Sequence, residues 1–261
     1  MAETRIHPSA IIEPGAEIGP GCEIGPFCIV GPEVRLGAGV TLQSHVVLTG
    51  ATTIGDETAI FPFASIGQAP QDLKFKGEKT QLIIGKRNRI REYVTMNPGT
   101  EGGGGITQVG DDGLFMAGAH VAHDCRIGDR VILVNHVSVA GHCVLEDDVI
   151  VGGLSGVHQF VRIGHGAMIG ALSMVTADVI PFGLVQGPRA HLDGLNLVGL
   201  KRRGASRDEI HALRDLLGKL GGGAFRDTAR HMAEEEHPAK IREVLDFILG
   251  PSDRSFLAPH P

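Results

Sequence analysis

An aliphatic residue recurs at every sixth position along most of this chain. The series covers residues 6–66, resumes over 84–96, and after a second break covers 109–175. Every position in the series holds Ile, Val or Leu except Met96 and Phe115. Neither the period of an α-helix nor that of a simple strand matches six residues. The pattern therefore predicts repeated units of one short strand and one corner.

A second stripe lies four residues after each aliphatic position and holds small or β-branched residues. Its first members are Ala10, Ala16, Cys22, Cys28, Val34 and Val40. Three hexads, or 18 residues, make one turn of a triangular coil, and successive turns pair as parallel strands about 4.8 Å apart. Glycine often follows the aliphatic residue directly, and we expect it to relieve the corner backbone.

All four cysteines fall on the second stripe. Cys22 and Cys28 lie in the first coils, whereas Cys125 and Cys143 are one coil apart and should stack on each other. A disulfide between the latter two is geometrically allowed. We interpret all four as reduced core residues, which is the expectation for a cytoplasmic protein.

The two breaks in the period predict external loops over residues 67–82 and 98–108. Long loops on a regular scaffold often carry function. The hexads stop near Gln186, so we expect a β-helical domain over 1–186 and a small α-helical domain over 187–261.

The C-terminal region contains clear helix signals. Ser206 and Glu209 have the spacing of a capping box, and apolar residues follow at helical intervals up to Gly221. A second helix is expected from about Phe225, with Pro238 interrupting or restarting it.

Composition narrows the functional classes. The formal net charge of −6 argues against general nucleic-acid binding. No apolar run is long enough to cross a bilayer, and the first residues lack the apolar stretch of a secretory signal. We therefore expect a cytoplasmic protein.

The coil length predicts which side chains share a column. His123, Gly141 and Gln159 are 18 residues apart, and His142 lies one coil beyond Asp124. Because a filled β-helix has no internal pocket, chemistry must occur on its outer faces or between subunits.

Three interpretations of the histidines between 120 and 158 remain open. They can be incidental surface residues, they can bind zinc as in the γ-type carbonic anhydrases, or one of them can act as a general base. The third interpretation has a mechanism: a neutral imidazole at His123 takes a proton from an attacking hydroxyl, Asp124 orients the ring, and the Gly141 N–H stabilises an oxyanion.

Several segments resemble a known family. They are 24–32 (IGPFCIVGP), 71–74 (QDLK), 89–92 (RIRE), 119–125 (AHVAHDC), 140–142 (AGH), 158–160 (HQF) and 199–204 (GLKRRG). The hexads alone are typical of left-handed parallel β-helices of the hexapeptide-repeat superfamily. The whole set is similar to the acyl-carrier-protein-dependent UDP-N-acetylglucosamine O-acyltransferases of lipid A biosynthesis.

This resemblance implies a left-handed parallel β-helix and a homotrimer with active sites between subunits. It implies transfer of a (3R)-hydroxyacyl chain from acyl carrier protein to the 3-position of UDP-N-acetylglucosamine. The expected catalytic residues are His123, Asp124 and Gly141. The expected substrate contacts are Gln71, Asp72, Lys74, His120, His142, Gln159, Ala171, Asn196, Arg202 and Arg203. No metal or other cofactor is expected, since the carrier protein delivers the phosphopantetheine.

The chain departs from the family pattern at two places. Asn97-Pro98 stands where His-Arg is expected, and Val198 stands where Glu is expected. Both leave open whether the acceptor carries a 3-hydroxyl or a 3-amino group. Ala171 occupies the position that limits acyl length in the family, and a residue larger than Gly there favours a shorter chain.

Basic residues cluster at Lys86, Arg87, Arg89 and Arg91. They form either a solvated face or a docking patch for the acidic carrier protein. Two further functions remain as alternatives to the one implied by the resemblance: a hexapeptide acyltransferase that uses coenzyme A, and a β-helix without catalytic activity.

Overall fold

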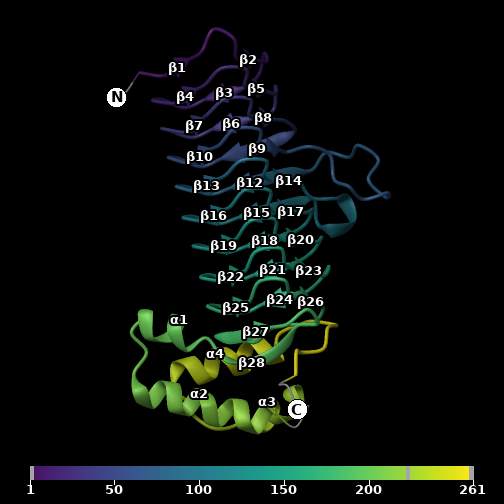
Figure 1. Cartoon of the computed structure of the whole chain (residues 1–261). Helices are drawn as coiled ribbons and strands as arrows, with labels where there is room; N and C mark the ends of the chain where they lie inside the picture. Colours follow the sequence, from purple (N-terminus) through teal and green to yellow (C-terminus); the bar gives the residue numbers. More distant parts are fainter. Residues whose placement is uncertain (1–2, 222–223, 259–261) are drawn as a thin grey trace.

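Each hexad forms one short strand, of two residues in most cases, and three successive strands carry the chain once around a triangular prism (Figure 1). The computed structural model describes residues 3–221 and 224–258. Strands one coil apart pair in parallel register, so that Val121 on one strand lies opposite Met96 and Val139 on its neighbours. The hexad period thus specifies three parallel sheets around one core.

The three sheets form the faces of the prism. Sheet 1 contains β1 (Arg5–Ile6), β4 (Glu23–Ile24), β7 (Thr41–Leu42), β10 (Ala59–Ile60), β13 (Arg89–Ile90), β16 (Leu114–Phe115), β19 (Ile132–Leu133), β22 (Ile150–Val151), β25 (Met168–Ile169), β27 (Gly183–Gln186) and β28 (His191–Leu195). Sheet 2 contains β2 (Ile11–Ile12), β5 (Ile29–Val30), β8 (Val47–Leu48), β11 (Ser65–Ile66), β14 (Thr95–Met96), β17 (His120–Val121), β20 (Ser138–Val139), β23 (Gly156–Val157) and β26 (Met174–Val175). Sheet 3 contains β3 (Glu17–Ile18), β6 (Arg35–Leu36), β9 (Ala51–Ile54), β12 (Gln81–Ile84), β15 (Ile106–Val109), β18 (Arg126–Ile127), β21 (Val144–Leu145) and β24 (Arg162–Ile163). We name the corners between them edge 1/2, edge 2/3 and edge 3/1.

The aliphatic series fills the interior of the prism as predicted. Residues from Ile24 to Val175 in this series are buried, whereas Ile6 is 45% exposed because no earlier coil covers it. The second stripe packs beside them and includes the four cysteines, all of which are buried and free. Burial raises the pKa of the Cys125 thiol well above its usual range, which favours the unreactive protonated form. The predicted left-handed parallel β-helix with a helical C-terminal region is confirmed, and so is the placement of the four cysteines in the core.

Glycine follows the aliphatic residue for a different structural reason from the one predicted. The positive φ angles of the corners occur two residues later, for example at Phe27 (59°) and His45 (58°), and not at Gly25. A Cβ on Gly25 would lie 2.8 Å from the Gln43 carbonyl oxygen of the next coil. These glycines therefore permit the close approach of adjacent coils, and the prediction that they relieve the corner backbone is wrong.

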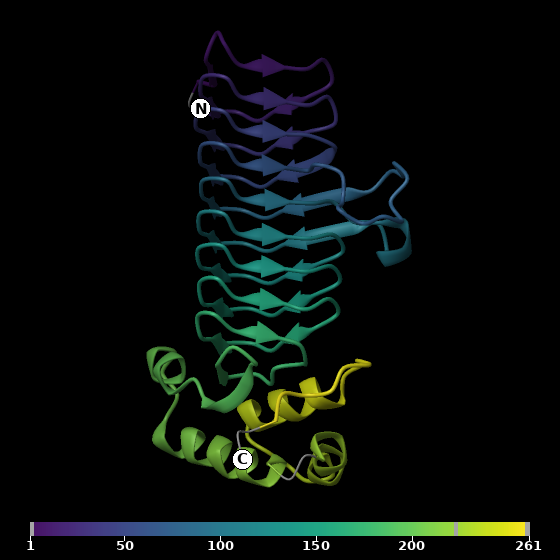
Figure 2. The same ribbon diagram turned by 45° about the vertical axis from the view of Figure 1, so that its right-hand side comes forward.

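Both breaks in the hexad period project from edge 2/3 (Figure 2). Loop 1 spans residues 67–80, between β11 and β12, and loop 2 spans residues 97–105, between β14 and β15. Loop 2 contains the short 3₁₀ helix η1 (Glu101–Gly103). The structure thus gathers the two longest departures from the repeat on one corner of the prism.

Helices close the C-terminal end of the prism (Figure 1). They are α1 (Leu197–Arg202), α2 (Arg207–Leu220), α3 (Phe225–Ala233) and α4 (Ala239–Leu249). The predicted capping box at Ser206 and Glu209 is confirmed, Gly221 is the C-cap of α2, and α4 restarts after Pro238. The sequence did not indicate α1 or β28, which pairs antiparallel with β27 beyond the predicted boundary at residue 186. The glycines at 222 and 223 lie outside the described residues.

Polar contacts join the helices to the last coils. Arg162 on β24 donates to the buried Asp178 carboxylate at 2.8 Å, and its guanidinium lies 4.5 Å from the ring centroid of Phe247 on α4. His165 contacts Glu243 of α4 at 2.6 Å, and this carboxylate raises the pKa of the His165 imidazole. Among the helices of the described residues, none is long and apolar enough to cross a bilayer.

We predict opposite effects of alanine at two glycines. Gly25→Ala should lower the free energy of unfolding by about 1–3 kcal/mol, because the new methyl group would clash with backbone atoms of the next coil. Gly218→Ala should raise it by about 0.5–1 kcal/mol, because Gly218 lies in α2 with open space around its Cα. Urea unfolding of both variants measures this; equal effects would contradict the packing explanation.

Candidate active site

The predicted column of His123, Gly141 and Gln159 lies along edge 2/3. Each residue follows its strand of sheet 2 by two positions, and those strands pair in register. A Cβ on Gly141 would lie 2.5 Å from Cε1 and 2.7 Å from Nε2 of His123. The imidazole therefore rests against the Gly141 backbone, in space that only glycine leaves open.

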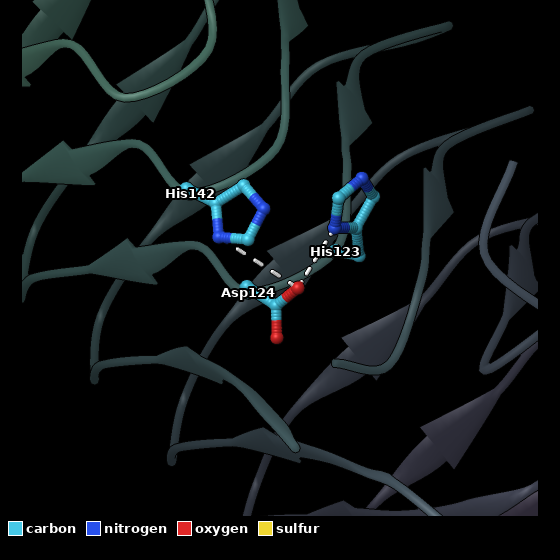
Figure 3. Close-up of side chains that lie close together, drawn as sticks. All are labelled: His123, Asp124 and His142. Carbon is cyan, nitrogen blue, oxygen red and sulfur yellow. Dashed lines mark hydrogen bonds and ion pairs between the residues drawn. The ribbon is translucent and has the colours of Figure 1, made fainter. Parts of the chain in front are cut away.

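His123 and Asp124 form a close pair at this corner (Figure 3). The Nδ1 atom of His123 lies 2.8 Å from Oδ2 of Asp124, whose side chain is only 1% exposed. An ionised carboxylate is only an acceptor, so Nδ1 carries the proton in this pair. The lone pair of the neutral ring is then on Nε2, which faces the surface of the prism.

His142 lies one coil beyond Asp124 and packs between two rings. It meets His123 edge-on, with centroids 5.0 Å apart, and it stacks on Phe160 at 4.3 Å. Its Nδ1 is 3.8 Å from Oδ2 of Asp124. Burial lowers the pKa of the His142 imidazole, so the ring favours its neutral form.

His120 is on the outer face of sheet 2, three residues before His123 in the same coil. Its Nδ1 lies 2.8 Å from the Thr95 hydroxyl. Burial lowers the pKa of His120, and the neighbouring His123 adds to that effect. Two neutral imidazoles therefore flank His123 near pH 7.

Loop 1 approaches His123 from outside the prism. The Oδ2 atom of Asp72 is 4.0 Å from Nε2 of His123, and its Oδ1 accepts a hydrogen bond from the Lys74 backbone N–H at 3.0 Å. The side-chain amide of Asn97 donates to the Gln68 carbonyl at 2.9 Å and so ties the base of loop 1 to β14. Asn97, which departs from the family pattern, thus has a structural role in this chain.

A cavity of about 560 Å³ opens in front of these residues. Its polar lining includes Gln71, Asn97, His120, His123 and Gln159. Its floor is the outer face of sheet 2, where Gly156 and Met174 lie. The cavity thus joins a polar rim at edge 2/3 to a more apolar surface along the sheet.

Four predicted substrate contacts lie away from this cavity. Ala171 is on edge 1/2, between β25 and β26. Asn196 and Arg203 both donate to the Gly166 carbonyl on edge 3/1, at 3.0 and 3.3 Å, and Arg202 is exposed beside them at the end of α1. Within one chain, the structure therefore divides the predicted site between different corners of the prism.

The basic cluster is largely neutralised within the chain. Lys86 pairs with Asp56 at 3.0 Å, Arg87 with Asp112 at 2.7 Å, and Arg91 with Glu92 at 3.0 Å. Arg89 alone of the four has no ion pair among the described residues. These contacts favour the solvated face over the carrier-docking patch.

His123, Asp124 and His142 also place possible metal ligands within 4.8 Å of one another. However, Oδ2 of Asp124 already accepts hydrogen bonds from His123 and from the Thr100 hydroxyl, and Oδ1 accepts from the Thr100 N–H. A metal would have to displace these donors. The arrangement favours acid–base chemistry over the zinc interpretation.

Sequence reasoning missed the threonines that hold Asp124. The Thr107 hydroxyl accepts from the Asp124 N–H at 2.7 Å, and Thr100 in loop 2 contacts the carboxylate. Neither residue lies in the column of His123: Thr107 is in β15 of sheet 3, and Thr100 is in loop 2, where the 18-residue spacing is interrupted. No signal in the sequence distinguishes them from other core or loop threonines.

Comparisons with known proteins agree with the geometry. Residues 178–257 match a family described as UDP N-acetylglucosamine O-acyltransferase, domain 2, and residues 2–32 and 15–50 match the bacterial transferase hexapeptide repeat. The chain is 81% identical, over 100% of both chains, to the acyl-[acyl-carrier-protein]–UDP-N-acetylglucosamine O-acyltransferase of Paracoccus denitrificans. It is 45% identical to the protein of the same name from Agrobacterium fabrum, with 99% of this chain and 97% of that one covered. The UDP-N-acetylglucosamine acyltransferase from Campylobacter jejuni superposes with a TM-score of 0.92 at 37% identity, covering 98% of this chain and 100% of that one.

We predict that both histidines beside His123 titrate below the usual histidine value of 6.5. Burial disfavours their charged forms, so each ring should gain its proton only when the pH falls below that value. NMR titration of ¹³Cε1-labelled histidines, assigned with His120→Gln and His142→Gln, measures both. A midpoint at or above 6.5 for either ring would contradict the assignment of neutral neighbours.

Proposed function

The chain belongs to the acyl-[acyl-carrier-protein]–UDP-N-acetylglucosamine O-acyltransferases, and we propose that it performs their reaction with His123 as the general base. The acyl group is a (3R)-hydroxyacyl chain, and the acceptor is the 3-position of the sugar in the first step of lipid A biosynthesis. One observation carries the residue assignment: the His123 ring has its Nδ1 on the Asp124 carboxylate and its Nε2 side against the Gly141 backbone.

The proton transfer follows from the tautomer of His123. Nε2 takes the proton of the sugar hydroxyl as its oxygen attacks the thioester carbonyl. The Asp124 carboxylate holds Nδ1–H and stabilises the imidazolium that forms. A C–O bond forms, the C–S bond then breaks, and the imidazolium returns its proton to the departing phosphopantetheine sulfur.

The Gly141 N–H is suited to stabilise the tetrahedral oxyanion. Among the described residues this N–H has no hydrogen-bond acceptor, whereas the neighbouring N–H groups of Ala140 and His142 are both bonded to backbone carbonyls. An unsatisfied donor beside the base offers charge stabilisation where the attacked carbonyl must lie. The absence of a side chain at 141 keeps that position accessible.

The other polar residues in the cavity and around His123 are proposed to bind the substrates. His120, His142 and Gln159 contact the sugar and the acyl group, while Gln71, Asp72 and Lys74 of loop 1 contact the glucosamine and the phosphopantetheine arm. Their positions around His123 support these roles. The reaction needs no metal or soluble cofactor, since the thioester arrives already activated on the carrier protein.

A homotrimer is supported by the unequal faces of the prism. Apolar residues form part of the outward surface of sheets 1 and 2: Leu114, Ile132, Ile150 and Met168 on sheet 1, and Ile11, Ile29, Val47 and Met174 on sheet 2. The charged outward residues of sheet 1, Arg5, Glu23 and Arg89, lie on its earlier strands. Sheet 3 instead presents charged residues such as Glu17, Arg35 and Arg126. Edge 1/2 exposes Phe27 (58%), Leu154 (63%) and Leu172 (62%). Such a surface is typical of a subunit interface.

A threefold axis beside edge 1/2 would also complete the site. It sets sheet 2 of one subunit across a wedge-shaped cleft from sheet 1 of the next, and the ring closes by cyclic symmetry. Edge 2/3, with His123, then forms one lip of the cleft, and edge 3/1 of the partner subunit, with Asn196, Arg202 and Arg203, forms the other. The planar guanidinium groups of the arginines on that lip can each donate paired hydrogen bonds to the phosphate oxygens of the nucleotide. Ala171 lies at the narrow end, where it limits acyl length.

Location and acceptor chemistry complete the proposal. The free cysteines are consistent with the reducing cytoplasm. Asn97 is used to hold loop 1, and Val198 is 60% exposed on α1, so neither presents the acid or base of the family pattern to the acceptor. Assays with both the 3-hydroxyl and the 3-amino sugar nucleotide decide the bond formed.

We predict that His123→Ala lowers kcat by about 10²–10⁴-fold, because it removes the base while leaving the core unchanged. Thioester release from hydroxyacyl carrier protein with UDP-N-acetylglucosamine measures the rate, and light scattering measures the assembly. His211→Ala, on the exposed face of α2, is the control and should match the wild type. Near-normal turnover by His123→Ala would refute the base, and activity with acetyl-coenzyme A instead would favour a coenzyme A-dependent enzyme.

We predict complementation between two inactive variants. His123→Ala and Arg203→Ala disable opposite lips of the cleft, so mixed trimers from refolding or co-expression should regain activity. Random mixing at equal amounts leaves about a quarter of the clefts intact. No recovery in verified mixed oligomers would mean that each site lies within one chain.

A further inference from the structure

Loop 2 encloses the carboxylate of Asp124. Thr100, which is only 6% exposed, donates its backbone N–H to Oδ1 at 2.8 Å and its hydroxyl to Oδ2 at 2.6 Å. The Oδ2 atom is the same oxygen that accepts Nδ1–H of His123. Both contacts of Thr100 therefore act on the group that orients the proposed base.

The side chain of Thr100 contacts Asp124 and does not cap the helix that follows it. Thr100 is the N-cap of η1, yet its hydroxyl makes no capping hydrogen bond. A threonine at such a position ordinarily caps the following backbone N–H groups. Its orientation toward Asp124 is thus set by the carboxylate and not by the helix.

Gly103 closes loop 2 over the other side of the carboxylate. A Cβ on Gly103 would clash with all three atoms of the Asp124 carboxyl group. Because that carboxyl group is buried and held by three hydrogen bonds, it has little freedom to move away. Loop 2 therefore defines the position of the carboxylate from two directions.

We propose that Thr100 is a positioning residue of this reaction, acting through Asp124 on His123; this rests on the proposed function. The two donors from Thr100 fix the rotation of the carboxylate, so that Oδ2 faces Nδ1 and keeps the lone pair of the ring on Nε2. Outer partners that orient metal-bound histidines are worth about 10–100-fold in affinity or activity, and we expect an effect of the same order here. Thr100 itself is buried within loop 2 and is not among the residues that line the cavity in front of His123.

Substitutions at Thr100 test the role directly. Thr100→Val keeps the shape and removes the hydroxyl, so kcat should fall by about 10–100-fold with KM changed by less than about 2-fold. Thr100→Ser should restore most of the loss. Thr58→Val is the matched control, because the buried Thr58 hydroxyl donates to the Gly85 carbonyl away from the site. A kcat for Thr100→Val equal to that of the control would overturn the proposal.

A double-mutant cycle separates this proposal from the one it rests on. In an Asp124→Asn background, Thr100→Val should lower kcat by less than about 2-fold further, because the group it positions is already changed. Losses that multiply would show that Thr100 acts independently of Asp124 and would overturn the inference. Full activity of Asp124→Asn alone would instead refute the His123–Asp124 pair of the proposed function.

Two neighbouring glycines give a second, independent probe. Gly103→Ala pushes on the carboxylate without removing a donor and should lower kcat, whereas Gly102→Ala has open space around its Cα and should not. Circular dichroism and light scattering check that both variants fold and assemble. Equal rates for the two variants would contradict the enclosure of Asp124 by loop 2.

Discussion

The parallel register between successive coils is the constraint on which the rest of the structure depends. Each 18-residue turn returns the backbone to the same face, and adjacent coils approach so closely that a side chain on Gly25 would clash with the next coil. The same register places the His123 ring against the backbone of Gly141 one coil later. The repeat that packs the core thus also places the proposed base, His123, beside the backbone N–H of Gly141.

The departures from this repeat provide the specific chemistry. Because the interior is filled with aliphatic residues, the polar groups gather at edge 2/3, where both loops leave the prism. Loop 1 brings Asp72 toward the open side of His123, and loop 2 holds Asp124 from behind. A regular scaffold supplies rigidity, and two insertions convert one of its corners into a site.

Much of this arrangement could be predicted from the sequence, since the hexad period fixes both the fold and the column of His123 and Gly141. The capping box of α2 was equally readable because it depends on local hydrogen bonds. The reason for the corner glycines was not, because periodicity does not reveal which residue adopts a positive φ. The contact between Thr100 and Asp124 could not be predicted, since Thr100 lies in a loop that does not follow the 18-residue spacing. Arg203 matches the family pattern, but its place on edge 3/1 emerged only from the structure.

A crystal structure of the enzyme with the acylated sugar nucleotide would show directly whether both lips of the cleft bind one substrate molecule. The proposed mechanism requires the ester oxygen at hydrogen-bonding distance, about 2.6–3.2 Å, from Nε2 of His123, the carbonyl oxygen on the Gly141 N–H, and the diphosphate on Arg203 of the partner subunit. A product bound with its ester far from His123, or entirely within one subunit, would contradict it.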